Sequence, residues 1–316
     1  MTLAEAGVPG TYSIWAAPLH NGPVPGGLTD AELIDVRRQY HSSNAGGTES
    51  GWRDPVNDMR RWRDVIAGHQ SYDELVLWFE HDLFDQLNLI QLLAWIHEHV
   101  PVRKPVSLIC IGSFPGRPDF KGLGELTAGE LAPLFETRLP VTDGQYALAG
   151  RAWDAFRQPT PEAIDTLRRE ETAALPYLAE ALTRFLQEYP WTGDGLSRTE
   201  RRLLRLASEG SISLGKAFAQ MGQDDRFFTI TDLALLTTVN EMSRISPPLL
   251  SIERPASSEH PFRALLGMTD AGRSTLSGRM DRVESCGIDR WLGGVHLHGR
   301  RDMWRWDDAT QRVTRT

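Results

Sequence analysis

Cysteine is scarce in this chain, since its 316 residues include only Cys110 and Cys286. Two cysteines exclude a disulfide scaffold and a cysteine-rich zinc site, and they suit a reducing compartment. No apolar run approaches the roughly 18 residues that a membrane-spanning helix needs. The first ten residues lack a basic segment followed by an apolar one, so we expect no secretory signal. These absences predict a cytoplasmic protein without a membrane partner.

The sequence also lacks the short motifs of familiar enzyme classes. It contains no H-E-x-x-H, no G-x-S-x-G, no G-x-G-x-x-G and no Walker spacing. The run Gly-Ser-Phe-Pro-Gly at residues 112–116 is compatible with backbone contacts to a phosphate, but a turn after a strand is the simpler explanation. No reaction class therefore follows from a local motif.

Positive charge is in short supply in the front part of the chain. The whole sequence has 34 Lys and Arg against 42 Asp and Glu, a net charge of −8. Of these, 18 basic and 15 acidic side chains fall in residues 195–316, which leaves 16 basic and 27 acidic side chains in residues 1–194. Because attraction to phosphate supplies most non-specific affinity for nucleic acid, the acidic part is a poor surface for duplex DNA.

The composition is that of a globular protein, with 41% hydrophobic and 24% charged residues. Its length predicts two or three compact units. We expect an α/β domain with a parallel Rossmann-like sheet over residues 1–150. This domain is followed by an α-helical connector over 151–192. A winged-helix-like domain with a terminal hairpin covers 193–316.

The α/β prediction depends on two continuous apolar runs, residues 74–79 and 106–111, which are typical of buried strands. Residues 83–99 between them carry apolar side chains at helical spacing. A strand, a helix and a strand in this order predict a βαβ unit with parallel pairing.

Upstream of this unit, residues 11–16 are β-prone and predict a short strand. A helix is predicted from a Thr29 cap to about Gln39, and another over residues 54–68 with Pro55 as its first helical residue.

The C-terminal prediction depends on the order of the elements. Ser197 and Glu200 have the spacing of a capping box and predict the start of a helix. The elements predicted after it are a helix over 213–221, a helix over 231–245, strands at 249–252 and 264–268, a helix from Thr269 and a terminal hairpin within 287–306.

The most informative polar cluster follows the first buried strand. Ligands of parallel sheets gather outside the carboxyl ends of the strands, where helix N-termini present free N–H groups. Several polar side chains are expected at this rim, either from residues 80–86 or from the loops after two other predicted strands. They are Glu80, His81, Asp82, Asp85, Gln86, His20 and Ser113.

We interpret this rim as a site for a small, phosphorylated or nucleotide-like ligand, with hydrolysis or group transfer as a possible reaction. His20, His81 and Glu80 are the candidate catalytic residues, with a histidine as general base. The candidate ligand-binding residues are Asp82, Asp85, Gln86 and Ser113. Glu80, Asp82 and Asp85 also form a candidate site for a divalent metal such as Mg²⁺.

A structural role explains the same residues. Asp82 is an ordinary helix N-cap, and Asp85 is a first-turn acid that the helix dipole favours. Glu80 and His81 are then hydrogen-bonding partners of neighbouring loops. The sequence leaves both interpretations open.

A DNA-binding regulator is the alternative function, with the helix at 231–245 as its recognition helix, and a protein-interaction adaptor is a third. The helix has one arginine, Arg244, against Asp232 and Glu241, which is weak for major-groove recognition. In the tail, His296 and His298 are two residues apart and would share one face of a strand, where they form a metal site or an exposed strand face.

Four segments together resemble a bacterial family whose N-terminal part is called domain of unknown function eighteen thirty-five. The resemblance extends over nearly the whole chain and implies a Rossmann-like N-terminal unit, a helical middle and a winged-helix-like C-terminal part. It implies no particular activity. The segments are WFEHDLFDQL from Trp78, LICIGSFPG from Leu108, FKGLGELT from Phe120 and DRWLGGVHL from Asp289.

This chain departs from the family pattern at its beginning. Relatives have a first strand and an Asn-Gly-Asp-Ser-like turn before a helix, whereas this sequence begins about where that helix should end. The resemblance therefore implies that the first strand and its turn are missing, which would leave an unpaired edge in a buried sheet.

Overall fold

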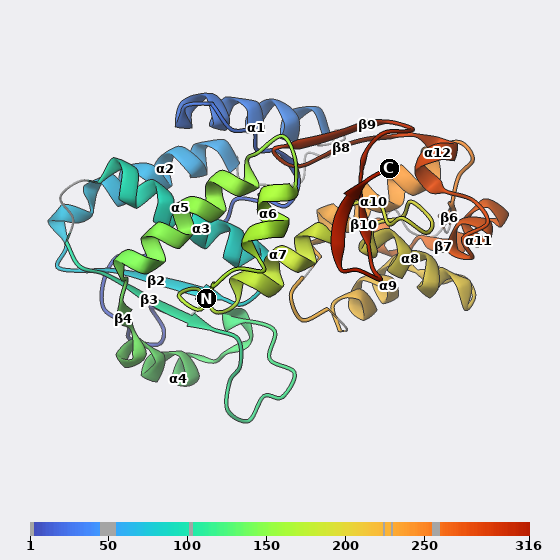
Figure 1. Cartoon of the computed structure of the whole chain (residues 1–316). Coiled ribbons are helices and arrows are strands. Elements are labelled where there is room, and N and C mark those ends of the chain that lie inside the picture. The colour runs from blue at the N-terminus through green and yellow to red at the C-terminus, as the bar shows by residue number, and fades with distance from the viewer. Residues whose placement is uncertain (1–2, 45–54, 101–103, 224, 229, 255–259) are drawn as a thin grey trace.

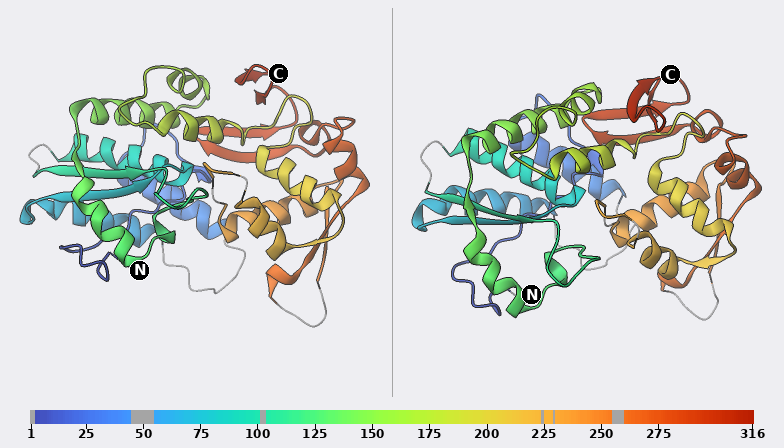
Figure 2. Two further views of the ribbon diagram at one scale, coloured as in Figure 1. Left: turned by 90° about the horizontal axis from the view of Figure 1, so that it is seen from below. Right: turned by 60° about the horizontal axis from the view of Figure 1, so that its bottom comes forward.

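The computed structural model describes residues 3–44, 55–100, 104–223, 225–228, 230–254 and 260–316. The chain forms an α/β lobe and a C-terminal lobe side by side (Figures 1 and 2). Among the described residues, no helix combines the length and the apolar character needed to cross a bilayer.

The predicted βαβ unit is confirmed at the centre of the α/β lobe. It consists of β2 (Leu75–Glu80), α3 (Leu83–His99) and β3 (Val106–Ile111). β2 and β3 pair in parallel, from Leu75 opposite Val106 to Glu80 opposite Ile111. The short strand β4 (Leu139–Pro140) adds to β3 in the antiparallel direction. Within the described residues this sheet has three strands, so the α/β class is observed without an extended parallel sheet.

Helices surround this small sheet. α3 and α5 cover one of its faces and α4 lies on the other side (Figure 1). Thr29 accepts a hydrogen bond from the amide of Glu32 at the start of α1, as its cap position predicted. The further elements of this lobe are α1 (Asp30–Asn44), α2 (Pro55–Ala67), η1 (Gly68–Ser71), η2 (Leu123–Glu125), α4 (Ala128–Leu131), η3 (Ala132–Thr137) and α5 (Asp143–Phe156).

The strand predicted at residues 11–16 is wrong, because this segment pairs with no strand. The side chain of Asn88 in α3 takes the place of a strand partner for the residue that follows. Its Oδ1 accepts from the amide of Ala17 at 2.8 Å, and its Nδ2 donates to the Ala17 carbonyl at 2.9 Å. The first described strand is the two-residue β1 (Gly22–Pro23).

The helical connector and the C-terminal lobe follow the predicted order. The Ser197–Glu200 capping box is confirmed at the start of α8. The short strand β5 joins β7 and β6 in an antiparallel sheet of order β5-β7-β6. The elements are α6 (Glu162–Leu167), α7 (Leu178–Leu186), α8 (Arg198–Ser208), β5 (Ile212–Ser213), α9 (Leu214–Met221), α10 (Asp232–Arg244), β6 (Leu250–Glu253), η4 (Pro261–Arg263), β7 (Leu265–Met268), α11 (Asp270–Leu276) and α12 (Arg282–Cys286).

The tail forms two hairpins rather than the single one predicted. The first joins β8 (Ile288–Gly293) to β9 (Val295–Gly299), and the second joins β10 (Trp304–Asp307) to β11 (Arg312–Arg315). β8 also pairs in parallel with β1 near the N-terminus, so the first hairpin reaches from the C-terminal lobe to the α/β lobe (Figure 2).

The turn of this hairpin requires glycine. A Cβ on Gly294 would lie 2.1 Å from the carbonyl oxygen of Arg157, at the end of α5. The preceding Gly293 has a φ of 60°, in the left-handed region that glycine adopts at low cost. The turn therefore packs directly on the backbone of the α/β lobe.

We predict that Asn88→Ala lowers the free energy of unfolding by about 2 kcal/mol or more, because it leaves the buried amide and carbonyl of Ala17 without their partner. Urea denaturation monitored by circular dichroism measures this change. Gln158→Ala, which removes an exposed amide that bonds within its own helix end, is the control and should shift stability little. An Asn88→Ala protein as stable as the wild type would contradict this role.

Candidate functional site

The three predicted carboxylates lie together at the carboxyl end of β2. Glu80 is the last residue of β2, Asp82 is the N-cap of α3, and Asp85 lies in its first turn. One oxygen from each lies within 4.8 Å of the others. The convergence expected from the sequence is therefore present.

Each of these carboxylates also accepts a hydrogen bond from a backbone amide. Asp82 accepts from the amide of Asp85 at 2.8 Å, and Asp85 accepts from the amide of Glu80 at 2.7 Å. Glu80 accepts from the amide of Leu123. Gln86 donates from Nε2 to the carbonyl of Glu80 at 2.7 Å. These bonds tie the end of the strand to the start of the helix.

Burial favours the protonated forms of two of the three carboxylates, Glu80 and Asp85. Burial raises the pKa of Glu80 to about 7, against the lowering effect of the Leu123 amide. Burial, then the charges of Asp82 and Glu80, raise the pKa of Asp85 to about 8. A divalent cation would have to displace these protons, so metal binding by this cluster is favoured only as the pH rises.

The protein itself covers the N-terminus of α3. The amide of Leu83 donates to the carbonyl of Phe227 at 2.7 Å, and Arg226 donates to the carbonyl of Gly112 at 3.0 Å. Gly122 packs so closely on Glu80 that an added Cβ would lie 2.3 Å from the carboxylate. The amide of Leu83, at the helix N-terminus where a ligand was predicted, is thus hydrogen-bonded to the C-terminal lobe.

His81 and Ser113 do not join the carboxylates. His81 is completely buried among the rings of Phe120, Tyr177 and Phe227, with centroids 5.5–6.3 Å away. Burial, and then the nearby charge of Arg226, lower the pKa of His81. Ser113 is exposed in the loop after β3.

His20 lies apart from the rim, in the wall of a cavity of about 880 Å³ between the two lobes. Its ring contacts Phe84 and Phe228, with centroids 6.0 and 5.3 Å away. Burial, and then the charge of Arg37, lower the pKa of His20 to about 4. The imidazole is therefore neutral at physiological pH.

Two glutamates and two arginines form a charged quartet, of which Glu200, Glu241 and Arg290 line the cavity and Arg282 is buried behind it. Arg290 donates to Glu200 at 2.7 Å and to Glu241 at 3.0 Å. Arg282 binds Glu241 and lies 3.6 Å from Glu200. Although burial alone would raise the pKa of Glu200, Arg290 and Arg282 lower it to about 2. The quartet joins α8, α10, α12 and β8.

α10 contributes both apolar and polar residues to the cavity lining, and the polar ones include Thr237, Thr238, Asn240 and Arg244. Arg254, after β6, also lines the cavity. Within the described residues, neither Arg244 nor Arg254 forms an ion pair with a carboxylate. No sequence pattern indicates this cavity, because its lining comes from segments far apart in the chain.

Comparison of the chain with models of protein families, with curated proteins and with solved structures gives no match.

We predict that Asp85→Asn flattens the dependence of stability on pH between about 4 and 8. Asp85 has a raised pKa in the folded state, so the folded protein binds a proton there that the unfolded chain releases. The contribution of this group to stability is therefore complete at low pH and declines as the pH rises toward 8. Asparagine keeps the acceptor for the amide of Glu80 and has no proton to lose.

The measurement is the free energy of unfolding at several pH values, with and without Mg²⁺. Asp143→Asn, at an exposed first-turn acid of α5, is the matched control and should leave the pH dependence unchanged. A purely structural cluster shows no effect of Mg²⁺. Stabilisation of the wild type, but not of Asp85→Asn, by Mg²⁺ at pH 8 would instead identify a metal site.

Proposed function

We propose that this protein binds a small anionic ligand, of phosphorylated or nucleotide-like chemistry, in the cavity between its two lobes. The observation that carries the proposal is the cavity itself, because its volume of about 880 Å³ lies in the range of roughly 300–1,000 Å³ typical of ligand pockets. It lies where two lobes meet, a preferred location of such pockets.

Two exposed arginines in the cavity lining support an anionic ligand, beside a lining that also contains the carboxylates Glu188, Glu200, Glu241 and Asp289. The quartet is balanced internally, with two carboxylates against two guanidinium groups. Arg244 and Arg254 add positive charge that no carboxylate of the described residues neutralises. Guanidinium groups bind phosphate and carboxylate through paired N–H donors. Thr237 and Asn240 add neutral hydrogen-bonding groups beside them.

Hydrolysis or group transfer is part of the proposal through His20. A neutral imidazole in the wall of the cavity can accept a proton from water or from a ligand hydroxyl. We assign the acidic cluster at Glu80 a mainly structural role, because each of its three carboxylates accepts a hydrogen bond from a backbone amide.

The organisation into a Rossmann-like lobe, a helical connector and a winged-helix-like lobe is part of the same proposal. The order α8, α9, α10, β6, β7 and the pairing of β5, β7 and β6 support the winged-helix interpretation. Together with the four segments quoted above, this order supports membership of the domain of unknown function eighteen thirty-five family.

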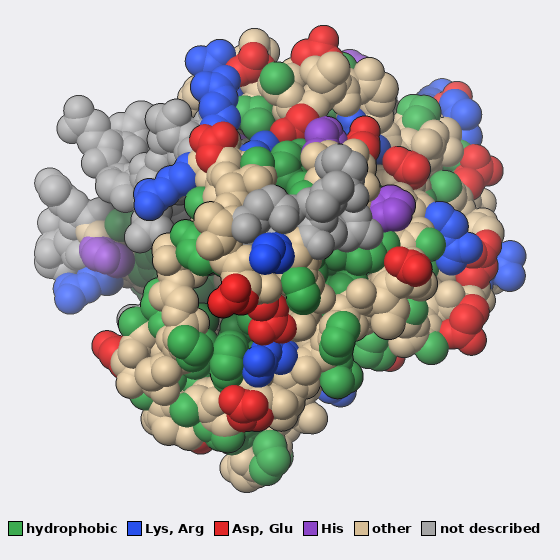
Figure 3. All heavy atoms as spheres, turned by 90° about the vertical axis from the view of Figure 1, so that its left-hand side faces the viewer, with side chains coloured by type: hydrophobic (Ala, Val, Ile, Leu, Met, Phe, Trp, Pro, Cys, Tyr) green, Lys and Arg blue, Asp and Glu red, His purple; other side chains and the backbone are tan. Residues whose placement is uncertain are grey.

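Ligand binding is favoured over regulation of DNA. The residues of α10 that line the cavity include Thr237, Asn240 and Arg244, the polar residues that a recognition helix would use in a groove. On the described part of the α/β face in Figure 3, acidic and basic side chains are interspersed, so that face offers a duplex no continuous positive surface.

We predict that pyrophosphate and ATP, used as probes, raise the melting temperature of the wild type and that Arg244→Gln abolishes the shift. Binding at 100 times the dissociation constant stabilises the folded state by about 2.7 kcal/mol. Thr237→Phe, which fills the cavity from the exposed face of α10, should also abolish the shift. Arg205→Phe, on the exposed side of α8 outside the cavity, should leave it intact.

Binding of labelled duplex DNA at increasing salt completes the test. Tight binding with a steep dependence on salt, together with no response to either probe, would replace the ligand proposal by the DNA-binding alternative.

A further inference from the structure

The hairpin β8–β9 carries three potential metal ligands on one face. Asp289 lies directly opposite His298 in the antiparallel register, and His296 is opposite Trp291. Residues two apart on a strand, and residues opposite one another across a pair, point to the same side of the sheet. His296, His298 and Asp289 therefore share one side of the hairpin.

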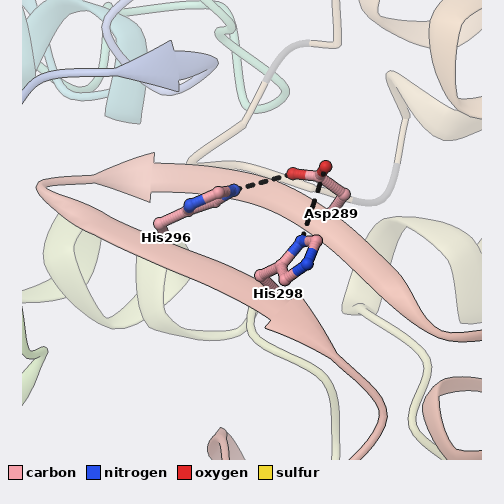
Figure 4. Close-up of side chains that lie close together, drawn as sticks. All are labelled: Asp289, His296 and His298. Carbon is pink, nitrogen blue, oxygen red and sulfur yellow. Dashed lines mark hydrogen bonds and ion pairs between the residues drawn. The ribbon is translucent and has the colours of Figure 1, made fainter.

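Figure 4 shows both imidazole rings beside the carboxylate of Asp289. Nε2 of His296 lies 2.7 Å from Oδ1 of Asp289, and Nδ1 of His298 lies 3.6 Å from Oδ2. One ligand atom of each residue lies within 4.8 Å of the others. Within the described residues, these side chains form ion pairs only with one another.

Neighbouring side chains fix the position of the strand and of one histidine of this cluster. The ring of His296 stacks on Trp291, with centroids 4.4 Å apart and planes within 2°. On the opposite side of β8, Arg290 is held by Glu200 and Glu241. These contacts fix the strand and one imidazole, so ordering the site on ion binding costs little entropy.

We propose that Asp289, His296 and His298 bind a divalent first-row transition metal ion, with Zn²⁺ as the representative. Two imidazoles and one carboxylate suit Zn²⁺, Co²⁺ and Ni²⁺, whereas Mg²⁺ and Ca²⁺ prefer oxygen ligands alone.

The spacing suits such an ion. Tetrahedral Zn²⁺ with bonds of about 2.0–2.1 Å separates neighbouring ligand atoms by about 3.3 Å. Nδ1 of His298 lies 3.6 Å from Oδ2 of Asp289, close to this value, and Nε2 of His296 lies 2.7 Å from the other oxygen, Oδ1, so that pair would open by about 0.6 Å.

Three protein ligands leave a coordination position open. Structural zinc sites usually have four protein ligands, whereas sites that bind water or substrate have three. Asp289 and Trp291 also line the cavity, so the ion would lie at its edge. The metal site itself does not depend on the ligand proposed for the cavity.

The test uses the full chain without an affinity tag, stripped of metal by a chelator. Titration with Zn²⁺ against a chromophoric competitor should give one ion per chain. The double variant His296→Ala/His298→Ala and Asp289→Asn should each weaken binding by about 100-fold or more, because each removes a direct ligand. With Co²⁺, the wild type should show the visible absorption of a low-coordinate site, and the double variant should not.

His99→Ala is the matched control. His99 is also exposed, stacks on Trp95 with centroids 4.9 Å apart, and lies 4.0 Å from the carboxylate of Glu98, but it has no second histidine in its group. Its removal should leave binding unchanged. Melting curves without metal should show that the variants are folded. Equal Zn²⁺ binding by the wild type and the folded double variant, or no stoichiometric binding at micromolar Zn²⁺, would overturn the proposal.

Discussion

The charged quartet of Glu200, Glu241, Arg282 and Arg290 is the interaction on which the C-terminal lobe depends. Arg282 and Glu200 are almost completely buried, and among the described residues the charged groups that pair with them are each other and the two remaining members of the quartet. Removing one partner of such a buried pair costs about 3–5 kcal/mol, because it leaves an uncompensated charge. The quartet thereby fixes β8 against α8 and α10, and with it both the cavity wall and the platform of the histidine pair.

Local structure was largely predictable, because neighbouring residues determine it. The apolar spacing and the Asp82 cap gave the bounds of α3, Leu83–His99, and the capping box gave the start of α8. The strand at residues 11–16 failed for a non-local reason. The next residue in the sequence, Ala17, bonds through its backbone to Asn88, whose side-chain amide offers one donor and one acceptor like a strand residue. Nothing in residues 11–16 signals that partner.

The candidate site was predictable only in part. Glu80, Asp82 and Asp85 converge because a strand end and a helix start are adjacent in sequence. Phe227 and Arg226, which cover this rim, belong to the other lobe. Sequence patterns around residues 80–86 therefore could not predict that the rim is covered. His20 instead contacts Phe84 and Phe228 and lines the cavity. The cavity that it lines is assembled from both ends of the chain, and no spacing rule detects such an arrangement.

The parallel pairing of Gly22–Pro23 with Leu292–Gly293 places two segments about 270 residues apart in the sequence in one sheet. Contacts between such distant positions require closure of a very long loop, and topologies rich in them fold slowly. During synthesis, the segment that carries His20 cannot pair with β8 until β8 has left the ribosome. Assembly of the pocket is consequently a late event, and a prematurely terminated product lacking β8 has no means of closing it.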